Sequence, residues 1–464
     1  MNNLNSNFKK KYNIFFIGYF MLIGFASFFR YPDIKNELKY FIIIDQLIEN
    51  KNFFVLKYFN ELYPDKPPIY FWVLSFLRSI SKDTFYPLGL ILGGVIPATL
   101  IAYLSFKLSK TYWNEKMAYI STAIFITLPF IFGTTLVLRM DYFMTAFIML
   151  SLYIFFISYP KNISSKRLLL FYTFIAIGIL IKGGAAFVIP FLTILFYLYI
   201  NTNLKYLKKM RPISGTLIIL SVLFLWFFLI QKSDNGAQYI KLILGQETIG
   251  RVIKSKAHIR PFYYYLKQLP FTLLTLIPFF SLGIFFSIKN IFNIKKWKTI
   301  DKIAFSIFFP NFIFFSTISG KLDIYLLPLY YGMVIISLRF IEVKWPNFKY
   351  KIFKKILYIN IFSFIICIVA LPYYTNNYTL KLVTTILRNS NGNIYSYRFP
   401  DAKNISLEIN RKNLKDLPLD KINSTEANSL ILVRNKYIDD IYNRDTKIIY
   451  QNKKYTILEK RNEV

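Results

Sequence analysis

The sequence predicts an α-helical protein that crosses a membrane about 11 times, within a range of about 10 to 13, and carries a small α/β domain at its C-terminal end. Of the 464 residues, 55% are hydrophobic and 19% aromatic. The apolar residues form charge-free blocks of about 17 to 21 residues, which are long enough to cross a hydrocarbon layer roughly 30 Å thick. Lys and Arg lie mainly between these blocks, and the sequence becomes polar and rich in turn residues after position 371.

The positive charge of the chain indicates membrane topology. There are 58 Lys and Arg against 24 Asp and Glu, which gives a formal net charge of +34. A nucleic-acid-binding domain would gather such charge on one soluble face. Here it lies in loops, where cytoplasmic segments retain basic residues during insertion, so we expect no nucleic-acid partner. With one cysteine, Cys367, and one histidine, the chain has no internal disulfide, zinc finger or multi-histidine metal centre.

The first span and the loop after it indicate how the chain is oriented in the membrane. Lys9, Lys10 and Lys11 precede the apolar residues 13–29, and no small-residue cleavage site follows before Arg30. This pattern predicts an uncleaved span with a cytoplasmic N-terminus. Residues 30–86 then form an outer loop, because their basic and acidic residues nearly balance and no clean spanning block occurs. Residues 36–49 and 69–80 are predicted to be helices that lie at the membrane interface.

Basic loops alternate with nearly neutral loops along the rest of the chain, and this alternation indicates the direction in which each remaining span crosses the membrane. Residues 168–200 are too long for one helix and are interrupted by Ile181-Lys182-Gly183-Gly184. We predict two short spans there, since a single span would invert the charge bias of every later loop. The other predicted spans are residues 86–106, 117–138, 142–158, 213–230, 270–288, 304–318, 324–338 and 356–371.

Two domains follow from this pattern. Residues 1–371 form the membrane domain, with outer loops at 30–86 and 231–269. Residues 372–464 form a periplasmic or extracellular α/β domain. Within it, residues 429–433, 447–450 and 455–458 are short β-like runs.

The charged motifs all fall in outer loops. The spans carry almost no charge at their midpoints, where an ion-coupled transporter would place ionisable groups. The motifs are distant from one another in the chain, but all of them lie on the outer face of the membrane. This arrangement is typical of a site for a reaction at the membrane surface. The alternatives to such an enzyme are a lipid or glycan transporter and a noncatalytic scaffold that displays the C-terminal domain. The motifs are Asn36-Glu37-Leu38-Lys39-Tyr40, Tyr63-Pro64-Asp65-Lys66-Pro67-Pro68, Arg139-Met140-Asp141, residues 245–251 with His258 and Arg260, and Ser319-Gly320-Lys321-Leu322-Asp323-Ile324-Tyr325.

These motifs resemble those of the GT-C superfamily of glycosyltransferases, in particular the aminoarabinose transferases that modify lipid A and the related protein O-mannosyltransferases. Asn36 to Tyr40 is similar to the family's Asp-Glu-x-Arg-Tyr segment, and Tyr63 to Pro68 to its Tyr-x-Glu-Lys-Pro segment. Arg139 and Asp141 look like its Arg-Pro-Asp turn, and Lys182-Gly183 like its Lys-Gly-Pro. The segments 246–265 and 321–328 are also similar to those of the family.

The resemblance implies an inverting glycosyltransferase of a bacterial inner membrane, which moves a sugar from a polyprenyl phosphate to an acceptor lipid, glycan or protein on the outer face. Carboxylates would orient or deprotonate the acceptor, and cations would hold the departing phosphate. The candidates for the first role are Asp65, Glu37, Asp141 and Asn36. Those for the phosphate are Lys39, Lys66, Arg139, Lys182, Arg251, His258, Arg260, Lys321 and Tyr325. Asp65 matches the family's metal-binding Glu and is the candidate ligand of a divalent metal ion.

One departure from the family pattern concerns the acceptor. Asn36 occupies the position of the family's first acidic residue, and an amide does not accept a proton as a carboxylate does. Glu37, Asp33 or Asp141 would then supply the charge, or the acceptor needs less activation, or the enzyme is impaired. Lys39 replaces an Arg and so lacks its two parallel donors. The sequence identifies neither the sugar nor the acceptor.

Overall fold

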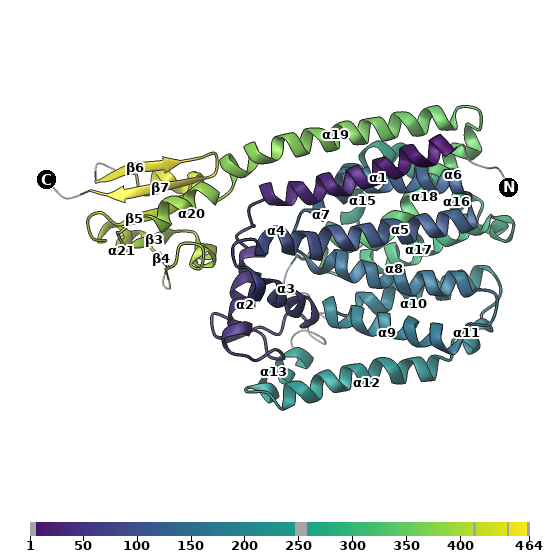
Figure 1. Ribbon diagram of the computed structural model, residues 1–464, viewed down its shortest axis with the longest axis horizontal. Helices are drawn as coiled ribbons and strands as arrows, with labels where there is room; N and C mark the ends of the chain where they lie inside the picture. The colour runs from purple at the N-terminus through teal and green to yellow at the C-terminus, as the bar shows by residue number, and fades with distance from the viewer. Residues whose placement is uncertain (1–5, 246–257, 412–413, 443–444, 462–464) are drawn as a thin grey trace.

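The computed structural model describes residues 6–245, 258–411, 414–442 and 445–461. Long helices run side by side in a bundle, and a small sheet domain lies at one end of it (Figure 1). We call this the domain end of the bundle and the other the far end. The first helix begins at the far end with Ser6, so its start and the C-terminal domain lie at opposite ends of the bundle (Figure 1).

The bundle is built from long apolar helices. In the described residues, eight helical stretches are long and apolar enough to cross a membrane. This confirms a polytopic, mostly helical membrane protein. The stretches are α1 (Ser6–Ala26) with the turn Ser27–Phe29, α4 (Phe85–Leu90) with α5 (Ile96–Tyr112), α8 (Met140–Ser158), α12 (Pro212–Gln231), α15 (Tyr264–Leu273) with α16 (Ile277–Lys289), α17 (Thr299–Thr317), the turn Asp323–Leu329 with α18 (Tyr330–Lys344), and α19 (Lys349–Tyr378).

The ninth stretch is bent. The predicted span 117–138 is divided into α6 (Glu115–Thr127) and α7 (Pro129–Thr135), which meet at 63°. Pro129 has no N–H to continue the helix, and the residue before a proline avoids the helical region; Leu128 accordingly has an extended ψ of 132°. This stretch is therefore a bent pair of helices and not one continuous helix.

The two short spans predicted in residues 168–200 are two separate helices, α9 (Ser165–Lys182) and α10 (Ala185–Ile200). Gly183 ends α9 with a φ of 112°, which glycine adopts without strain. By length and composition neither helix adds to the count of spans: α10 has 16 residues, and α9 carries Lys166, Arg167 and Lys182. The structure thus gives eight or nine spans in the described residues, and the predicted count of 11 is not confirmed.

Burial distinguishes the lipid-facing helices from the central ones. The stretch Asp323–Lys344 is 89% buried, whereas Lys349–Tyr378 is only 17% buried. Since α19 is apolar along most of its length, its exposed side chains suit contact with lipid tails. The helix does not end at Pro372, where the sequence predicts the start of the C-terminal domain, but continues to Tyr378 and leads into that domain (Figure 1).

The first outer loop caps the domain end of the bundle. It contains α2 (Glu37–Glu49) and α3 (Ile69–Ile80), which lie at the predicted positions. Between them, β1 (Lys57–Tyr58) and β2 (Glu61–Leu62) form a short hairpin. Arg78 of α3 donates two hydrogen bonds of 2.9 Å to the carboxylate of Asp45 in α2, which holds the two helices together.

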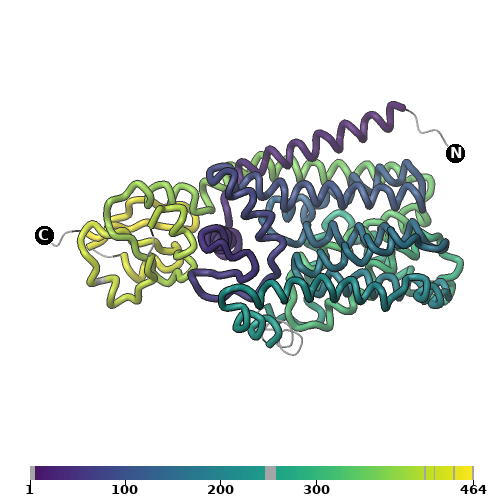
Figure 2. The backbone as a smooth tube through the Cα atoms, turned by 60° about the horizontal axis from the view of Figure 1, so that its bottom comes forward, coloured from purple at the N-terminus to yellow at the C-terminus, as the bar shows by residue number. Residues whose placement is uncertain are grey.

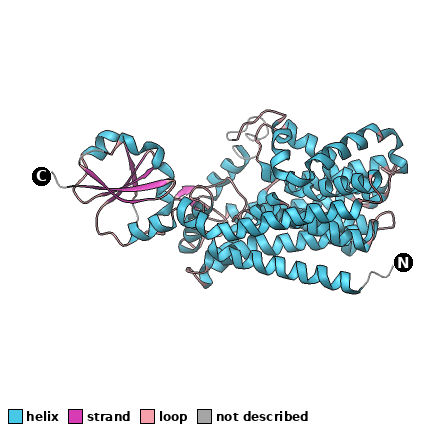
Figure 3. Cartoon of the chain, turned by 90° about the horizontal axis from the view of Figure 1, so that it is seen from above, coloured by secondary structure: helices cyan, strands magenta, loops and turns pink. Residues whose placement is uncertain are grey.

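The C-terminal domain contains a mixed five-stranded sheet in the order β4-β3-β5-β7-β6. Figure 3 shows these strands in magenta at one end of the molecule, beside the helical bundle. The predicted strands 429–433, 447–450 and 455–458 fall on β5, β6 and β7. The bounds are β3 (Ile394–Tyr397), β4 (Lys415–Leu417), β5 (Leu430–Arg434), β6 (Thr446–Gln451) and β7 (Tyr455–Lys460), with α20 (Lys381–Arg388) before the sheet and α21 (Leu419–Asn423) within its connections. Strands β3, β4 and β5 are parallel, and β7 runs antiparallel to β5 and β6.

This domain is docked on the first outer loop (Figure 2). The buried side chain of Asn404 donates to the backbone carbonyl of Ile34 at 2.7 Å and accepts from the hydroxyl of Tyr58 at 2.6 Å. The hydroxyls of Tyr31 and Thr384 lie 3.0 Å apart. The motifs of residues 36–66 therefore lie between the bundle and the domain.

Candidate functional site

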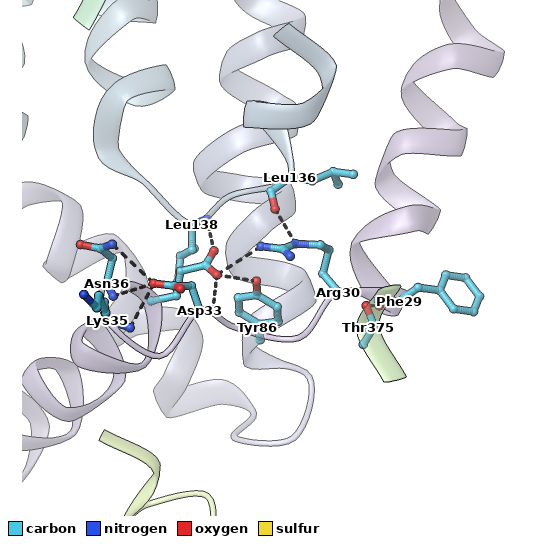
Figure 4. Close-up of polar contacts among 10 residues, drawn as sticks. Phe29, Arg30, Asp33, Lys35, Asn36, Tyr86, Leu136, Leu138 and Thr375 are labelled. Atoms are coloured by element: carbon cyan, nitrogen blue, oxygen red, sulfur yellow. Dashed lines mark hydrogen bonds and ion pairs between the residues drawn. The ribbon is translucent and has the colours of Figure 1, made fainter. Parts of the chain in front are cut away.

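Glu37 anchors the first outer loop to the bundle, and its partners Arg30, Tyr86 and Leu138 are labelled in Figure 4. Its carboxylate is fully buried and accepts from Arg30 Nη2 at 3.3 Å and from the hydroxyl of Tyr86 at 3.1 Å. The backbone N–H groups of Asp33 and Leu138 donate to it at 2.5 Å each. These donors come from the segment after α1, from α4 and from the segment before α8, so one side chain joins three parts of the chain.

The surroundings of Glu37 fit an anchor better than a reacting group. Burial raises the pKa of this carboxyl, while Arg30 and the two backbone donors oppose that shift. Both carboxylate oxygens already accept hydrogen bonds from the protein. An acceptor group would have to displace one of these donors, so the part of Glu37 in catalysis stays a prediction.

Asn36 lies just before α2 and is exposed, as is Asp33 beside it. One carboxylate oxygen of Asp33 accepts from the backbone N–H groups of Lys35 and Asn36 at 3.0 Å, and from Nδ2 of Asn36 at 3.4 Å (Figure 4). These bonds fold the segment just before α2 into a turn, since an Asp side chain commonly accepts from the backbone N–H two residues further on. A solvent-exposed carboxylate therefore stands next to the amide at position 36.

Asp141 holds two cations together at the domain end of the bundle. It lies in the first turn of α8, is 1% exposed, and forms ion pairs with Lys182 at the end of α9 and with Arg139 Nε at 3.2 Å. The ammonium of Lys182 also lies 4.7 Å from the centre of the Tyr325 ring. Four predicted site residues from distant segments thus form one cluster, which carries two positive charges and one negative.

Asp65 and Lys66 are half-buried in the turn before α3. Burial lowers the pKa of the Lys39 ammonium, and the charge of Asp65 opposes this shift, so Asp65 lies near Lys39. Burial raises the pKa of Tyr40, and the charges of Asp141 and Asp65 raise it further. Tyr40 therefore lies within electrostatic reach of both carboxylates and links the turn of Asp65 to the cluster of Asp141.

The second outer loop joins the same end of the bundle. Its helix α13 (Gly236–Leu242) places the hydroxyl of Tyr239 2.9 Å from the backbone carbonyl of Tyr63, which accepts its hydrogen bond. Tyr63 lies two residues before Asp65. The second loop therefore supports the turn that carries Asp65.

His258, Arg260 and Lys321 are brought together by backbone pairing. Arg260 N–H donates to Ser319 and Lys321 N–H to His258, each at 3.0 Å. His258 and Arg260 are exposed, but Lys321 is buried, and its ammonium donates to the backbone carbonyls of Arg260, at 3.1 Å, and Ile318. The ammonium of Lys321 thus joins the backbone at Arg260 to the backbone at Ile318. The predicted phosphate ligand Arg251 lies outside the described residues.

The candidate metal ligand is Asp65. In the part of the chain that the structure describes, no group of three or more His, Cys, Asp or Glu side chains could hold a metal ion. Asp141 faces two cations and Glu37 is saturated with donors, which leaves Asp65 alone. The role of Asp65 as a metal ligand therefore stays a prediction.

Several residues around the site were not predicted from the sequence. Arg30 and Tyr86 bind Glu37, and Lys403 and Asn404 reach the first outer loop from the C-terminal domain. No motif marks these residues. Arg78 could have been found from the sequence, because it is the only charged residue within the otherwise apolar predicted helix 69–80.

The chain is similar to known glycosyltransferases in sequence and in fold. Residues 65–227 match the family described as dolichyl-phosphate-mannose-protein mannosyltransferase. This region begins at Asp65 and includes Asp141 and Lys182. The undecaprenyl phosphate-alpha-4-amino-4-deoxy-L-arabinose arabinosyl transferase of Wigglesworthia glossinidia brevipalpis is 28% identical over 365 residues, 76% of this chain and 62% of that protein.

A second such transferase, transferase 1 of Proteus mirabilis (strain HI4320), is 24% identical over 368 residues, 76% of this chain and 64% of that protein. The chain thus spans less than two thirds of the length of these relatives. Among solved structures, ArnT from Cupriavidus metallidurans bound to undecaprenyl phosphate matches with a TM-score of 0.72. That match has 11% identity and covers 97% of this chain and 98% of the other.

The bundle with its capping loop and docked sheet domain therefore has the fold of ArnT. In sequence and in fold, the chain resembles the aminoarabinose transferases.

Proposed function

We propose that this protein is a glycosyltransferase that moves a sugar from a polyprenyl-phosphate donor to an acceptor at the membrane surface. The observation that carries the proposal is the cluster in which Arg139 and Lys182 share Asp141 at the domain end of the bundle. Its charge is net positive, and it lies at the end of apolar helices, where the headgroup of a lipid donor would meet it. The similarity to arabinosyl transferases supports the same class of reaction.

The cluster would bind the phosphate of the donor. In the reaction, an acceptor hydroxyl or amine attacks the anomeric carbon as the bond from that carbon to the phosphate oxygen breaks. The polyprenyl phosphate leaves with both electrons of that bond, and a single displacement inverts the anomeric centre. Arg139 and Lys182 would stabilise the negative charge that develops on the departing phosphate. Because Asp141 already fixes both cations, little reorganisation is needed.

Asp65 is the carboxylate that we assign to the acceptor. Glu37 and Asp141 are buried and engaged by protein donors, whereas Asp65 is half-exposed and lies near Tyr40. A carboxylate in this place can orient the acceptor and take its proton as the new bond forms. The acceptor would be a lipid, glycan or protein.

We also propose the sidedness of the reaction. The basic N-terminal segment and the loops at the far end would face the cytoplasm of a bacterial cell. The domain end, with its site, would then face the outer side of the inner membrane. A lipid-linked donor would reach the site from within the bilayer.

Exchange of Asp65 tests this function. Asp65→Asn is expected to lower the rate of sugar transfer from undecaprenyl-phosphate-linked 4-amino-4-deoxyarabinose by at least about 100-fold, since removal of an acid-base group typically has this effect. Transfer is measured by mass spectrometry of the products with purified protein in nanodiscs. The matched control is Glu61→Gln, an exposed carboxylate in the same loop, which should leave the rate unchanged. Full activity of Asp65→Asn would contradict the assignment.

Exchange of Asn36 tests the departure from the family pattern. Asn36→Asp is expected to be tolerated or activating, because the new carboxylate lies beside that of Asp33, whose oxygen is 3.4 Å from the present amide nitrogen. Two carboxylates at this distance raise the pKa of one of them, which makes it a better base near neutral pH. In the pH–rate profile of the variant, the rate should therefore fall at acidic pH as this carboxylate becomes protonated. A large loss of transfer would show that the amide itself has a role.

A further inference from the structure

A cavity of about 100 Å³ lies between α16 and α18 near the far end of the bundle, where both helices end (Figure 1). The two helices come close at Gly283, because a Cβ atom added there would lie 3.1 Å from Ile336. From this contact onward, each helix lines the cavity at spacings of three, four and seven residues, which fall on one helix face. Trp297 and Asp301 complete the wall. The side chains at these spacings are Phe286, Ser287 and Asn290 after Gly283, and Arg339, Phe340 and Val343 after Ile336.

The charged groups in the wall neutralise one another. Nε and Nη2 of Arg339 donate to the carboxylate of Asp301 at 2.6 and 2.9 Å, and Arg339 also pairs with Glu342. Glu342 in turn accepts from Lys349 at 3.0 Å. The two polar side chains that α16 contributes to the wall donate to backbone carbonyls of their own helix at 2.8 Å each. A molecule in the cavity therefore meets aromatic rings and a balanced set of charges.

The rim of the cavity is strongly positive. Lys289, Lys296, Lys298 and Lys344 are exposed, and each precedes or follows a residue of the wall in the sequence. We call them the rim lysines. The ammonium of Lys344 lies 4.9 Å from the centre of the Phe286 ring, so it lies beside the wall itself. In the described part of the chain, none of the rim lysines has a carboxylate oxygen within 4.0 Å. An anion at the rim would therefore meet several cations that have no acidic partner there.

The residues around the cavity place it at the surface of the bilayer. Phe292 lies among the rim lysines in the sequence and is 96% exposed. Trp297 lines the cavity, and Trp345 follows the end of α18. Aromatic side chains beside lysines are typical of the zone between lipid tails and water. On α16, Phe285 and Ile288 are exposed, as expected for side chains that contact lipid tails. The cavity therefore lies at the level of the lipid headgroups at the far end.

We propose that this cavity binds a glycerophospholipid with an anionic headgroup. The glycerol and the beginning of one acyl chain lie against Phe286 and Phe340, and the phosphate lies between Lys289 and Lys344. Basic pockets between spanning helices on the cytoplasmic side bind such headgroups, because anionic lipids are abundant in that leaflet. With the sidedness proposed above, the lipid belongs to the cytoplasmic leaflet.

This inference goes beyond the proposed function and does not depend on sugar transfer. No residue of the cavity belongs to the site at the domain end, which lies at the opposite end of the bundle. A ligand that binds only the folded protein stabilises it. The lipid therefore holds the ends of α16 and α18 and the start of α17 together at the cytoplasmic surface.

Native mass spectrometry tests the proposal. The full-length protein in a mild detergent is titrated with phosphatidylglycerol or with phosphatidylcholine of the same acyl chains, and the lipids bound to each protein molecule are counted. The first phosphatidylglycerol is expected to bind about tenfold more tightly than the first phosphatidylcholine, because its net negative charge lies near two or more lysines. Equal binding of the two lipids would overturn the proposal.

Two double variants separate the cavity from the basic surface in general. Lys289→Gln/Lys344→Gln is expected to weaken the binding of phosphatidylglycerol about 25-fold, about fivefold for each lysine. Lys205→Gln/Lys208→Gln is the matched control, because it removes two exposed lysines from another loop at the far end. This control should bind phosphatidylglycerol as the unmodified protein does. An equal loss in both double variants would mean that the whole basic surface attracts the lipid, and the proposal would be overturned.

Ser287→Phe tests the cavity itself, because it fills the space with a ring and leaves every charge in place. The binding of phosphatidylglycerol is expected to weaken about tenfold, the effect of losing contact with about two buried methylene groups. Thermal unfolding shows whether this variant is folded; the lysine variants change only exposed side chains and carry the test if it is not. Unchanged binding to folded Ser287→Phe would show that the cavity is not the site.

Glycerol 3-phosphate distinguishes a lipid from a free phosphate ester. It carries a phosphate on glycerol but has no acyl chains, so at the same concentration it is not expected to displace phosphatidylglycerol. If it competed as well as the lipid itself, the acyl chains would contribute nothing, and the identification of the ligand as a lipid would be wrong.

Discussion

Lys182→Met is expected to lower the rate of sugar transfer by about 100- to 1,000-fold, the effect of removing one preorganised group that stabilises developing charge. The variant keeps the length and the apolar stem of the side chain but removes the ammonium that pairs with Asp141. The cluster then carries Arg139 and Asp141 alone and has no net positive charge. Binding of undecaprenyl phosphate to protein in nanodiscs should weaken about tenfold or more, in line with the loss of a charge-assisted hydrogen bond.

The matched control is Lys166→Met, which removes a lysine from the exposed start of the same helix. This variant should bind undecaprenyl phosphate and transfer sugar at the rate of the unmodified protein. If Lys182→Met bound undecaprenyl phosphate as tightly as the control did, the cluster would not be the phosphate site. Thermal unfolding of both variants separates a loss of chemistry from a loss of structure.

Glu37→Ala is expected to destabilise the protein by about 3–5 kcal/mol, the range for breaking a buried ion pair by removal of one partner. The change leaves the guanidinium of Arg30 without its carboxylate and the N–H groups of Asp33 and Leu138 without an acceptor. The first outer loop would loosen where it joins the bundle. Amide hydrogen exchange in residues 30–40 and 136–140, together with unfolding in detergent, measures the effect.

Glu49→Ala is the control for this prediction, because it removes an exposed carboxylate from the last turn of the same helix. A surface change of this kind should alter the free energy of unfolding by less than about 0.5 kcal/mol. Should Glu37→Ala match the control in stability and lose only sugar transfer, Glu37 would be a reacting group and not an anchor.

The helices of the first outer loop could be predicted from the sequence almost to the residue. The apolar spacing of residues 36–49 and the 12-residue run 69–80 mark α2 and α3, because a helix that covers a bundle end needs one apolar face and is too short to span. The interruption at Gly183 likewise predicts two helices in residues 168–200. The bend at Pro129 was missed, since the apolar run continues without a break through the proline.

The candidate site was predicted in part. Arg139, Asp141, Lys182 and Tyr325 were predicted from the motifs as site residues. In the structure these four residues form one cluster. The sequence could not separate Glu37 and Asp141 from Asp65, because burial and hydrogen-bond partners decide which carboxylate is engaged. Lys39 was grouped with the donor phosphate, and the structure places it beside Lys403, 364 positions further along the chain.

The sequence by itself determined that the chain crosses a membrane and where its charged motifs lie along the chain. Both follow from local properties: the length of apolar runs must match the thickness of the bilayer, and loop charge follows the rules of insertion. Only the tertiary structure decided which charges meet. Glu37 binds Leu138, Asp141 pairs with Lys182, and Tyr58 bonds Asn404, 346 positions away. These contacts arise from the packing of helices and the docking of the C-terminal domain, and no local pattern in the chain encodes them.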